Sequence, residues 1–321
     1  MRATPLLPLL FSGWLAAPAY ADDAQDLLGR LAQAEQQQSF QGTFVYERNG
    51  GFSTHRIWHS VEQGKVRERL LQLDGSAQEI LRVDGLTQCV SGTLVTGLAN
   101  LPDPSGRVLD ARKLSAWYDM QVAGKSRVAG RAATILVMSP KDQHRYGVEL
   151  HLDNETGMVL KSLLLSEKGQ LLERFQFTEF DPSQPPGGQS LQASADCKPL
   201  PVSRSKPPAP VSSTPVAWHA DWLPPGFELG NESMRKDADS GAHVISLLYG
   251  DGLTRFSVFI EPVTAKVAPD IRTQFGPTAV VSRRLGSAQG EHMVTVVGEI
   301  PVGTAERIAL SMRHGEAAGS R

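Results

Sequence analysis

Apolar and polar residues alternate along most of the chain, the period typical of β-strands that bury one face. Turn-forming pairs such as Asn49-Gly50, Asp74-Gly75 and Lys168-Gly169 separate the alternating stretches. Before residue 182 this pattern predicts strands over 40–47, 52–61, 66–73, 79–83, 86–90, 133–138, 146–152, 158–165 and 171–180. Strands joined by short turns favour an antiparallel sheet, curled enough for helices to cover one face.

Two segments of the same region have helical spacing. Residues 23–38 place Ala24, Leu28 and Leu31 on one apolar stripe, and a short helix is predicted from Asp110 onward. We expect these helices to be the cover of the sheet.

A proline-rich stretch then divides the chain. Residues 199–216 hold six prolines and scattered serines, a composition typical of a stiff linker. Beyond it, strands are predicted over 244–249, 255–261 and 291–300, with a terminal helix capped by Thr304. The fold class is therefore α+β: a large domain over 22–198 and a smaller α+β domain over 217–321.

The first 21 residues predict an export signal. Arg2 precedes an apolar run over 6–17, and Ala19-Tyr20-Ala21 supplies the small residues of a cleavage site. The run is short for a membrane span and contains Pro8, so cleavage is favoured over a retained anchor. We expect the mature protein to be soluble and exported.

Charge and cysteine content limit the classes of function. Without the signal the chain has 31 basic and 34 acidic residues, which gives no reason to expect nucleic-acid binding. In an oxidising compartment Cys89 and Cys197 are candidates for a disulfide. One buried thiol and one thiol near the domain end remain the alternative.

No motif predicts catalysis, a metal or a cofactor. His55 and His59 are four residues apart on a predicted strand, which separates them by roughly 13 Å, too far to share one ion. The strand carboxylates Glu47, Glu68 and Glu173 are expected on solvated faces. We therefore expect a binding protein and not an enzyme.

Apolar strand faces are the remaining candidates for a site. They would either form an ordinary core under the helices or line a groove for an acyl chain, where each buried methylene contributes roughly 0.8 kcal/mol. The groove candidates are Phe44, Tyr46, Trp58, Leu136, Met138 and Leu150. Arg283 and Arg284, in a predicted loop, are candidates to pair with acidic groups of a partner, with a solvated loop as the alternative.

Several segments carry a family resemblance. Residues 218–227 (WHADWLPPGF), 248–253 (LYGDGL) and 296–301 (VVGEIP) resemble the C-terminal domain of the RseB/MucB family of periplasmic stress regulators. Residues 127–131 and 153–156 are similar to segments of that family's first domain.

The resemblance implies a LolA/LolB-like unclosed β-barrel followed by a small domain. It also implies a negative regulator that binds the periplasmic domain of a MucA/RseA-like anti-sigma factor and shields it from regulated proteolysis. The sigma factor for envelope stress and alginate genes would thereby stay inactive, until lipid A or another acyl lipid relieves the inhibition. A periplasmic lipid or lipoprotein carrier is the alternative, and a homodimer is left open.

Overall fold

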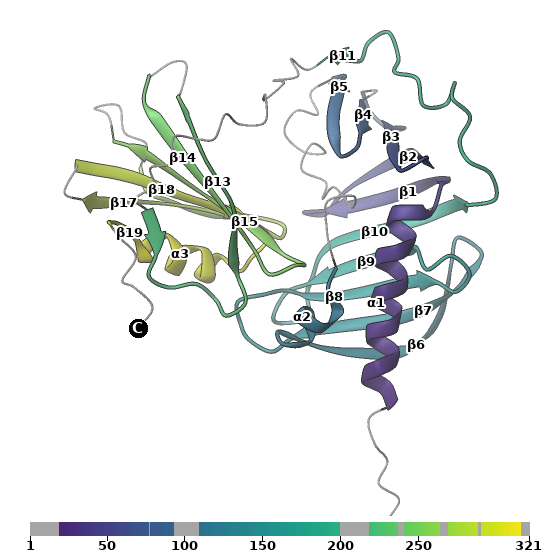
Figure 1. The fold of residues 1–321 in the computed structure, drawn as a ribbon, viewed down its shortest axis with the longest axis horizontal. Helices are drawn as coiled ribbons and strands as arrows, with labels where there is room; N and C mark the ends of the chain where they lie inside the picture. The colour runs from purple at the N-terminus through teal and green to yellow at the C-terminus, as the bar shows by residue number, and fades with distance from the viewer. Residues whose placement is uncertain are drawn as a thin grey trace, which may run out of the picture.

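The computed structural model describes residues 19–76, 78–92, 109–199, 218–236, 241–263, 269–287 and 290–315. Nearly all of the predicted signal and of the predicted linker lies outside these residues, so both stay predictions. The described chain forms two main antiparallel sheets, one before the proline-rich stretch and one after it (Figure 1).

The larger sheet has eleven strands in the order β11-β5-β4-β3-β2-β1-β10-β9-β8-β7-β6, and its end strands β11 and β6 do not pair with each other. The predicted unclosed barrel is thus confirmed. Its strands are β1 (Phe40–Arg48), β2 (Gly51–Glu62), β3 (Lys65–Gln72), β4 (Glu79–Val83), β5 (Leu86–Val90), β6 (Tyr118–Val128), β7 (Arg131–Pro140), β8 (Gly147–Asp153), β9 (Val159–Leu165), β10 (Leu171–Asp181) and β11 (Lys198–Pro199).

Tight turns with a left-handed backbone join the strands. Asn49 and Gly50 have φ angles of 55° and 72°, and Asp84 and Gly85 repeat the pattern with 49° and 75°. A two-residue hairpin turn with positive φ at both positions matches the right-handed twist of its strands. The turn residues therefore fix the hairpin order of the sheet.

Two helices cover the β6 to β8 end of the sheet. Helix α1 (Ala19–Gln37) lies across the strands in Figure 1, and α2 (Ala111–Ser115) begins after Asp110, whose carboxylate accepts hydrogen bonds from two backbone N–H groups. The predicted cover is confirmed. The core between these two helices and the sheet comprises Ala24, Leu28, Leu31, Leu114, Tyr118, Leu136, Met138, Leu150 and Leu152.

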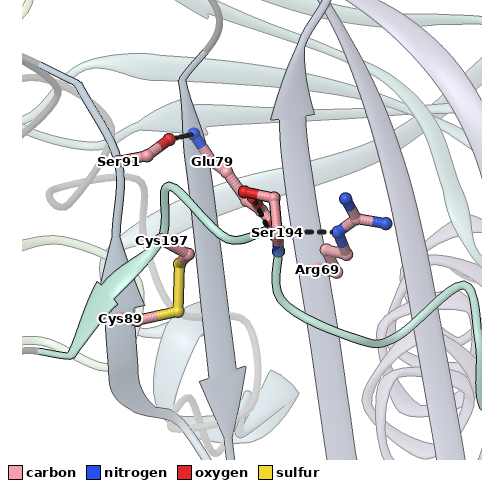
Figure 2. The surroundings of a disulfide bond; sticks show 6 residues. All are labelled: Arg69, Glu79, Cys89, Ser91, Ser194 and Cys197. Carbon is pink, nitrogen blue, oxygen red and sulfur yellow. Dashed lines mark hydrogen bonds and ion pairs between the residues drawn. A yellow bond between two sulfur atoms is a disulfide. The ribbon is translucent and has the colours of Figure 1, made fainter.

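The opposite end of the sheet is fastened from its outer side. Cys89 of β5 and Cys197 form a disulfide, which settles the question that the sequence left open (Figure 2). Beside it, the Glu79 side chain binds Ser194 and accepts a hydrogen bond of 2.7 Å from Arg69 Nε. Burial opposes ionisation of this carboxyl, but the hydrogen bonds from Ser194 and Arg69 lower its pKa. The segment that follows β10 is thereby held against β3, β4 and β5.

The smaller sheet has six strands in the order β13-β14-β15-β18-β17-β16, and α3 packs on it. The predicted inner side of helix α3 is confirmed, since Ala305, Ile308 and Ala309 are fully buried. The elements are β12 (Trp218–Ala220), β13 (Glu228–Lys236), β14 (His243–Gly250), β15 (Arg255–Pro262), β16 (Ile271–Phe275), β17 (Thr278–Ser287), β18 (Gly290–Gly298), α3 (Val302–Ser311) and β19 (Met312–His314). Strands β12 and β19 form a separate two-stranded ribbon.

Some local expectations were wrong. Helix α3 begins at Val302 after Pro301, so Thr304 lies inside the helix and does not cap it. Strands β6, β13, β16 and β17 have no counterpart among the predicted strands. The burial of β6 alternates along its whole length, but Gly124 and Ser126 at inward positions interrupt its apolar pattern, and the side chains of β13 are almost all exposed, which removes the period-two signal.

Within the described residues, no helix is long and apolar enough to cross a membrane.

Candidate functional site

An apolar cavity of about 240 Å³ lies on the inner face of the large sheet, beside the end of α1. Phenylalanine rings form much of its wall: Phe44 and Phe175 lie 4.7 Å apart between ring centroids, and Phe177 packs edge-on against both. The apolar lining consists of Phe40, Phe44, Ile57, Leu70, Met158, Val159, Phe175 and Phe177. The charged residues of the lining are Glu35, Glu68, Arg82 and Glu173.

One end of the cavity has a buried polar group, His59 with Glu68 and Arg82. Arg82 Nη1 lies 3.0 Å from Glu68 Oε1, and His59 Nδ1 lies 3.5 Å from Glu68 Oε2. All three residues are at least nine-tenths buried. The expectation of a solvated Glu68 was wrong, because β3 turns this side chain toward the inner face of the sheet.

The other end is closed by Tyr46, whose hydroxyl donates a hydrogen bond of 2.7 Å to Glu173 Oε2. Arg48 Nη1 lies 3.7 Å from the same carboxylate oxygen. Burial and the adjacent Glu173 carboxylate raise the pKa of the Tyr46 hydroxyl far above its usual value. This end is therefore a satisfied hydrogen-bonded group, and Glu173 is not on a solvated face.

Of the groove candidates, Phe44 and Tyr46 line the cavity, but Trp58 does not. Strand register decides this: Phe40 and Gly42 of β1 lie opposite His59 and Ile57 of β2. These β2 residues face inward with their partners, so the intervening Trp58 faces outward. There it lies against Arg69, whose guanidinium is 4.9 Å from the indole centroid.

Leu136, Met138 and Leu150 are on the inner face too, but helix α1 fills the space above them. They pack against Leu28 and Leu31 in a continuous core and do not reach the cavity. For these three residues the groove assignment was wrong and the ordinary-core alternative is correct.

Arg283 and Arg284 lie in strand β17 and not in a loop. Arg283 Nη2 lies 2.5 Å from Glu306 Oε1, and Arg272 binds the other oxygen of that carboxylate. These hydrogen bonds lower the pKa of Glu306. Arg284 is more exposed and lies 3.8 Å from Glu291. Arg283 therefore already joins β17 to α3 within the small domain.

A second feature, which the sequence gave no signal for, joins the two domains. Arg145, between β7 and β8, donates a hydrogen bond of 2.8 Å to Asp251 of the small domain, and both side chains are fully buried. Arg145 also binds Asp142 and the carbonyl oxygen of Pro225. Its guanidinium lies 4.8 Å from the Phe227 ring centroid. One cation thus holds residues from both sides of the interface.

Close packing surrounds this ion pair. Gly226 has a φ of +85°, and a Cβ there would lie 2.1 Å from the Trp117 ring. Only glycine permits both that conformation and that approach. Leu253 packs against the core under α1. The 224–227 and 251–254 loops of the small domain therefore insert against the helix-covered end of the large sheet.

A further set of interdomain contacts involves the β1–β2 hairpin and the β7–β8 loop. Arg48 binds Thr278 and lies 3.8 Å from Glu299. His144 Nδ1 lies 3.0 Å from Thr304 Oγ1. These contacts explain why Thr304 is buried although it does not cap its helix.

These features define a two-domain binding protein, in which an unclosed, helix-covered sheet holds an apolar cavity and a second sheet domain docks beside it. Two family models match the chain: the MucB/RseB N-terminal domain over residues 23–195 and the MucB/RseB C-terminal domain over residues 212–313. The chain belongs to the MucB/RseB family.

Relatives match over nearly their whole length. The chain is 56% identical to the sigma factor AlgU regulatory protein MucB of Pseudomonas aeruginosa over 315 residues, which cover 98% of each chain. It is 30% identical to the sigma-E factor regulatory protein RseB of Salmonella typhimurium, covering 94% of each.

Solved structures agree. The complex structure of Pseudomonas aeruginosa MucA/MucB matches with a TM-score of 0.78 and 56% identity, covering 92% of this chain and 100% of that one. A crystal structure of MucB matches with a TM-score of 0.68 and 55% identity, covering 91% and 98%. The relatives with established roles are regulators, in agreement with the binding role expected from the sequence.

Proposed function

We propose that this protein is a periplasmic negative regulator that binds the periplasmic part of a membrane-spanning, MucA-like anti-sigma factor. By covering that segment it protects the anti-sigma factor from regulated proteolysis, and the cognate stress and alginate sigma factor stays inactive. The observation that supports this most is the similarity over both domains to a MucB of 56% identity that has been solved in complex with MucA.

The interdomain contacts support a single binding unit. Arg145 and Asp251 form a fully buried ion pair, and Arg145 also binds the Pro225 carbonyl oxygen, so separating the domains would break several charge-assisted hydrogen bonds at once. A partner segment therefore meets two domains held in one arrangement. We keep the boundaries 22–198 and 217–321 for the two domains as part of this proposal.

Binding to the partner is tested with the full mature chain and a purified periplasmic segment of a MucA-like anti-sigma factor. Titration calorimetry measures affinity, and the rate at which a site-specific periplasmic protease cleaves the segment measures protection. We expect a stable complex and slower cleavage. Absence of both binding and protection would overturn the proposal.

The role of the paired arginines in this complex is a separate question. Arg284 is the better candidate contact, because Arg283 is bound to Glu306. Charge reversal by Arg284→Glu should weaken the complex only slightly, since exposed ion pairs contribute about 0–1 kcal/mol. An exposed arginine elsewhere, in the variant Arg67→Glu, is the control.

We also propose that an acyl lipid relieves the inhibition by preferring the form of the protein that does not hold the anti-sigma factor. In the calorimetric assay, lipid should weaken the partner's affinity, and the partner should weaken the lipid's affinity by the same factor. Equal partner affinity with and without saturating lipid would contradict this coupling.

The cavity also favours a second candidate function, a carrier of lipid or lipoprotein through the periplasm. A carrier would move labelled lipid between two populations of vesicles at a rate that depends on its concentration. The regulator would bind lipid without accelerating this transfer. Vesicle exchange in the presence of the full chain therefore separates the two functions.

A further inference from the structure

The β1–β2 hairpin places one arginine between the cavity and the small domain. Arg48 ends strand β1, and its two terminal nitrogens have different partners. Nη1 lies 3.4 Å from the Tyr46 hydroxyl and 3.7 Å from Glu173 Oε2. Nη2 donates a hydrogen bond to Thr278 Oγ1 and lies 3.8 Å from Glu299 Oε1. A single guanidinium therefore contacts both domains.

The partners of Nη1 belong to the cavity wall. Tyr46 and Glu173 both line the cavity, and the hydrogen bond of 2.7 Å between them holds the Glu173 carboxylate in place. The Arg48 and Glu173 side chains are mostly buried, so water only partly screens their attraction. A free arginine side chain samples many rotamers, and these contacts restrict it.

The partners of Nη2 belong to the small domain. Thr278 begins strand β17, and Glu299 follows strand β18. The turn before Thr278 packs on the same arginine: Gly276 has a φ of +58°, and a Cβ there would lie 3.0 Å from Arg48 Cγ and 3.4 Å from Asn49 Oδ1. The β16–β17 turn therefore rests on the β1–β2 hairpin, with Arg48 in the contact.

The chemistry of the guanidinium links the two sets of partners. The group is planar and rigid, so Nη1 and Nη2 move as one body. When the cavity wall holds Nη1, Nη2 is already oriented toward Thr278, and the rotamer entropy of the Arg48 side chain is lost only once. Each set of contacts therefore makes the other more favourable.

Other contacts between the domains lie away from the cavity wall. The Tyr146 hydroxyl accepts a hydrogen bond of 3.0 Å from Gln274, and His144 contacts helix α3, but neither Tyr146 nor His144 lines the cavity. The buried pair of Arg145 and Asp251 is outside the lining as well. Arg48 differs from these residues because it contacts the cavity wall and the small domain together.

From this geometry we propose that Arg48 is a positioning residue that couples the Tyr46–Glu173 pair of the cavity wall to the docking of the β16–β17 turn. Disturbing the pair releases Arg48 and loosens the turn, and loosening the turn weakens the pair by the same factor. This inference rests on the lipid-dependent regulation proposed above, for which it supplies a route between the domains. Its test uses neither lipid nor anti-sigma factor, so the two proposals can fail separately.

The first experiment disturbs the cavity wall and observes the small domain. Tyr46→Phe keeps the ring but removes the hydroxyl that binds Glu173 and contacts Arg48. Hydrogen exchange of the full mature chain should then show the amides of residues 274–279 exchanging about fivefold faster, the ratio expected for one lost hydrogen bond. Residues 251–254, which dock beside Arg145, should keep their rate. An unchanged rate over 274–279 would overturn the proposal.

A second background shows whether this effect passes through Arg48. In Arg48→Met the turn should already exchange faster, and adding Tyr46→Phe should change the rate by less than about twofold. Arg48→Lys covers the case in which Arg48→Met does not fold, because lysine keeps the charge but has one nitrogen and cannot serve both sets of partners. A fivefold effect of Tyr46→Phe that persists in either background would contradict coupling through Arg48.

The reverse experiment changes the small domain and observes the cavity wall. Thr278→Val removes the hydroxyl that binds Arg48 Nη2 and changes the side-chain shape little. In tyrosine-labelled protein the NMR signals of the Tyr46 ring should move, and in the Arg48→Lys background the same substitution should leave them in place. Thr273→Val makes the same change in the neighbouring strand β16 and is the control. A Tyr46 signal that does not respond to Thr278→Val, or responds equally to Thr273→Val, would refute the assignment.

Discussion

The inner face of the large sheet has two halves that the same alternating strands build differently. Over β6 to β8, Leu136, Met138 and Leu150 meet the side chains of α1, and the space is filled. Over β1 to β3 with β9 and β10, the inner face encloses the cavity and includes His59, Glu68 and Arg82. Inward-facing polar residues thus mark the half that contains the cavity, where Glu68 and Arg82 satisfy each other through an ion pair of 3.0 Å.

The two halves also differ in what holds them from outside. The filled half receives the small domain through Arg145 and the loops around Gly226 and Leu253. The cavity half is fastened at its outer face by the Cys89–Cys197 disulfide and the Glu79–Ser194 contact (Figure 2). The cavity half, whose core α1 enters only through Ala34 near its end, is therefore also stabilised by a covalent link.

The largest effect is expected from that covalent link. The disulfide closes a loop with a sequence separation of 108 residues, so reduction should lower the free energy of unfolding by about 4–5 kcal/mol in the chain-entropy model. Urea unfolding with and without reductant measures the loss. The double variant Cys89→Ser/Cys197→Ser is the control, because its stability should not respond to reductant.

Hydrogen exchange shows where the loss falls. After reduction, amides of β4 and β5 should exchange faster while those of β7 under α1 keep their protection. Equal acceleration in both halves would mean that the disulfide does not act on the cavity half in particular.

The next effect concerns the attachment of the small domain to the filled half. Asp251→Asn keeps the shape of the side chain but leaves the buried Arg145 charge with only the more exposed Asp142 as its anionic partner. The free energy of unfolding should fall by about 3 kcal/mol, as for other broken buried pairs. Calorimetric melting measures the change. Asp142→Asn is the control and should cost less, since Asp142 is 24% exposed.

A matched pair of leucines compares the interiors of the two halves directly. Leu136→Ala in the filled half should cost about 3–5 kcal/mol, because it leaves a new void in a packed core. Leu70→Ala on the cavity wall should cost about 2 kcal/mol, since this side chain already borders empty space. Urea unfolding of both variants checks the order, and equal costs would contradict a difference in packing between the halves.

The smallest effect is a pH dependence from His55, which lies opposite Phe44 next to the cavity. Burial lowers the pKa of His55 to about 4 in the folded chain, against about 6.5 when unfolded. Acid therefore favours the unfolded chain: stability is full above about pH 6.5 and falls as the pH drops toward 4. Between pH 7.5 and 5.5 the loss should be about 1 kcal/mol.

Denaturation midpoints at the two pH values measure this loss. His55→Phe removes the ionisation, so its stability should fall less over the same interval. An equal fall in the two proteins would assign the pH dependence to other groups.

The sequence by itself determined the local elements and their order. Period-two stretches placed nearly all the strands from β1 to β5 and from β7 to β10 within two residues of their ends, because alternation reports one buried face. Asn49-Gly50 fixed its hairpin through positive φ angles that few other residue pairs adopt. The spacing of Ala305, Ile308 and Ala309 identified the buried side of α3, because residues three and four positions apart lie on one face of a helix.

Only the tertiary structure decided which inner faces are filled and which enclose a cavity. Leu136 and Phe44 have the same local pattern, and the position of α1 alone separates core from cavity wall. Trp58 was assigned to the wrong face because the register of β2 against β1 decides which side chains of β2 point inward. A shift of one residue in this register would turn every β2 side chain to the opposite face. The pairing of Arg145 with Asp251 joins residues 106 positions apart, and no local spacing encodes such a contact.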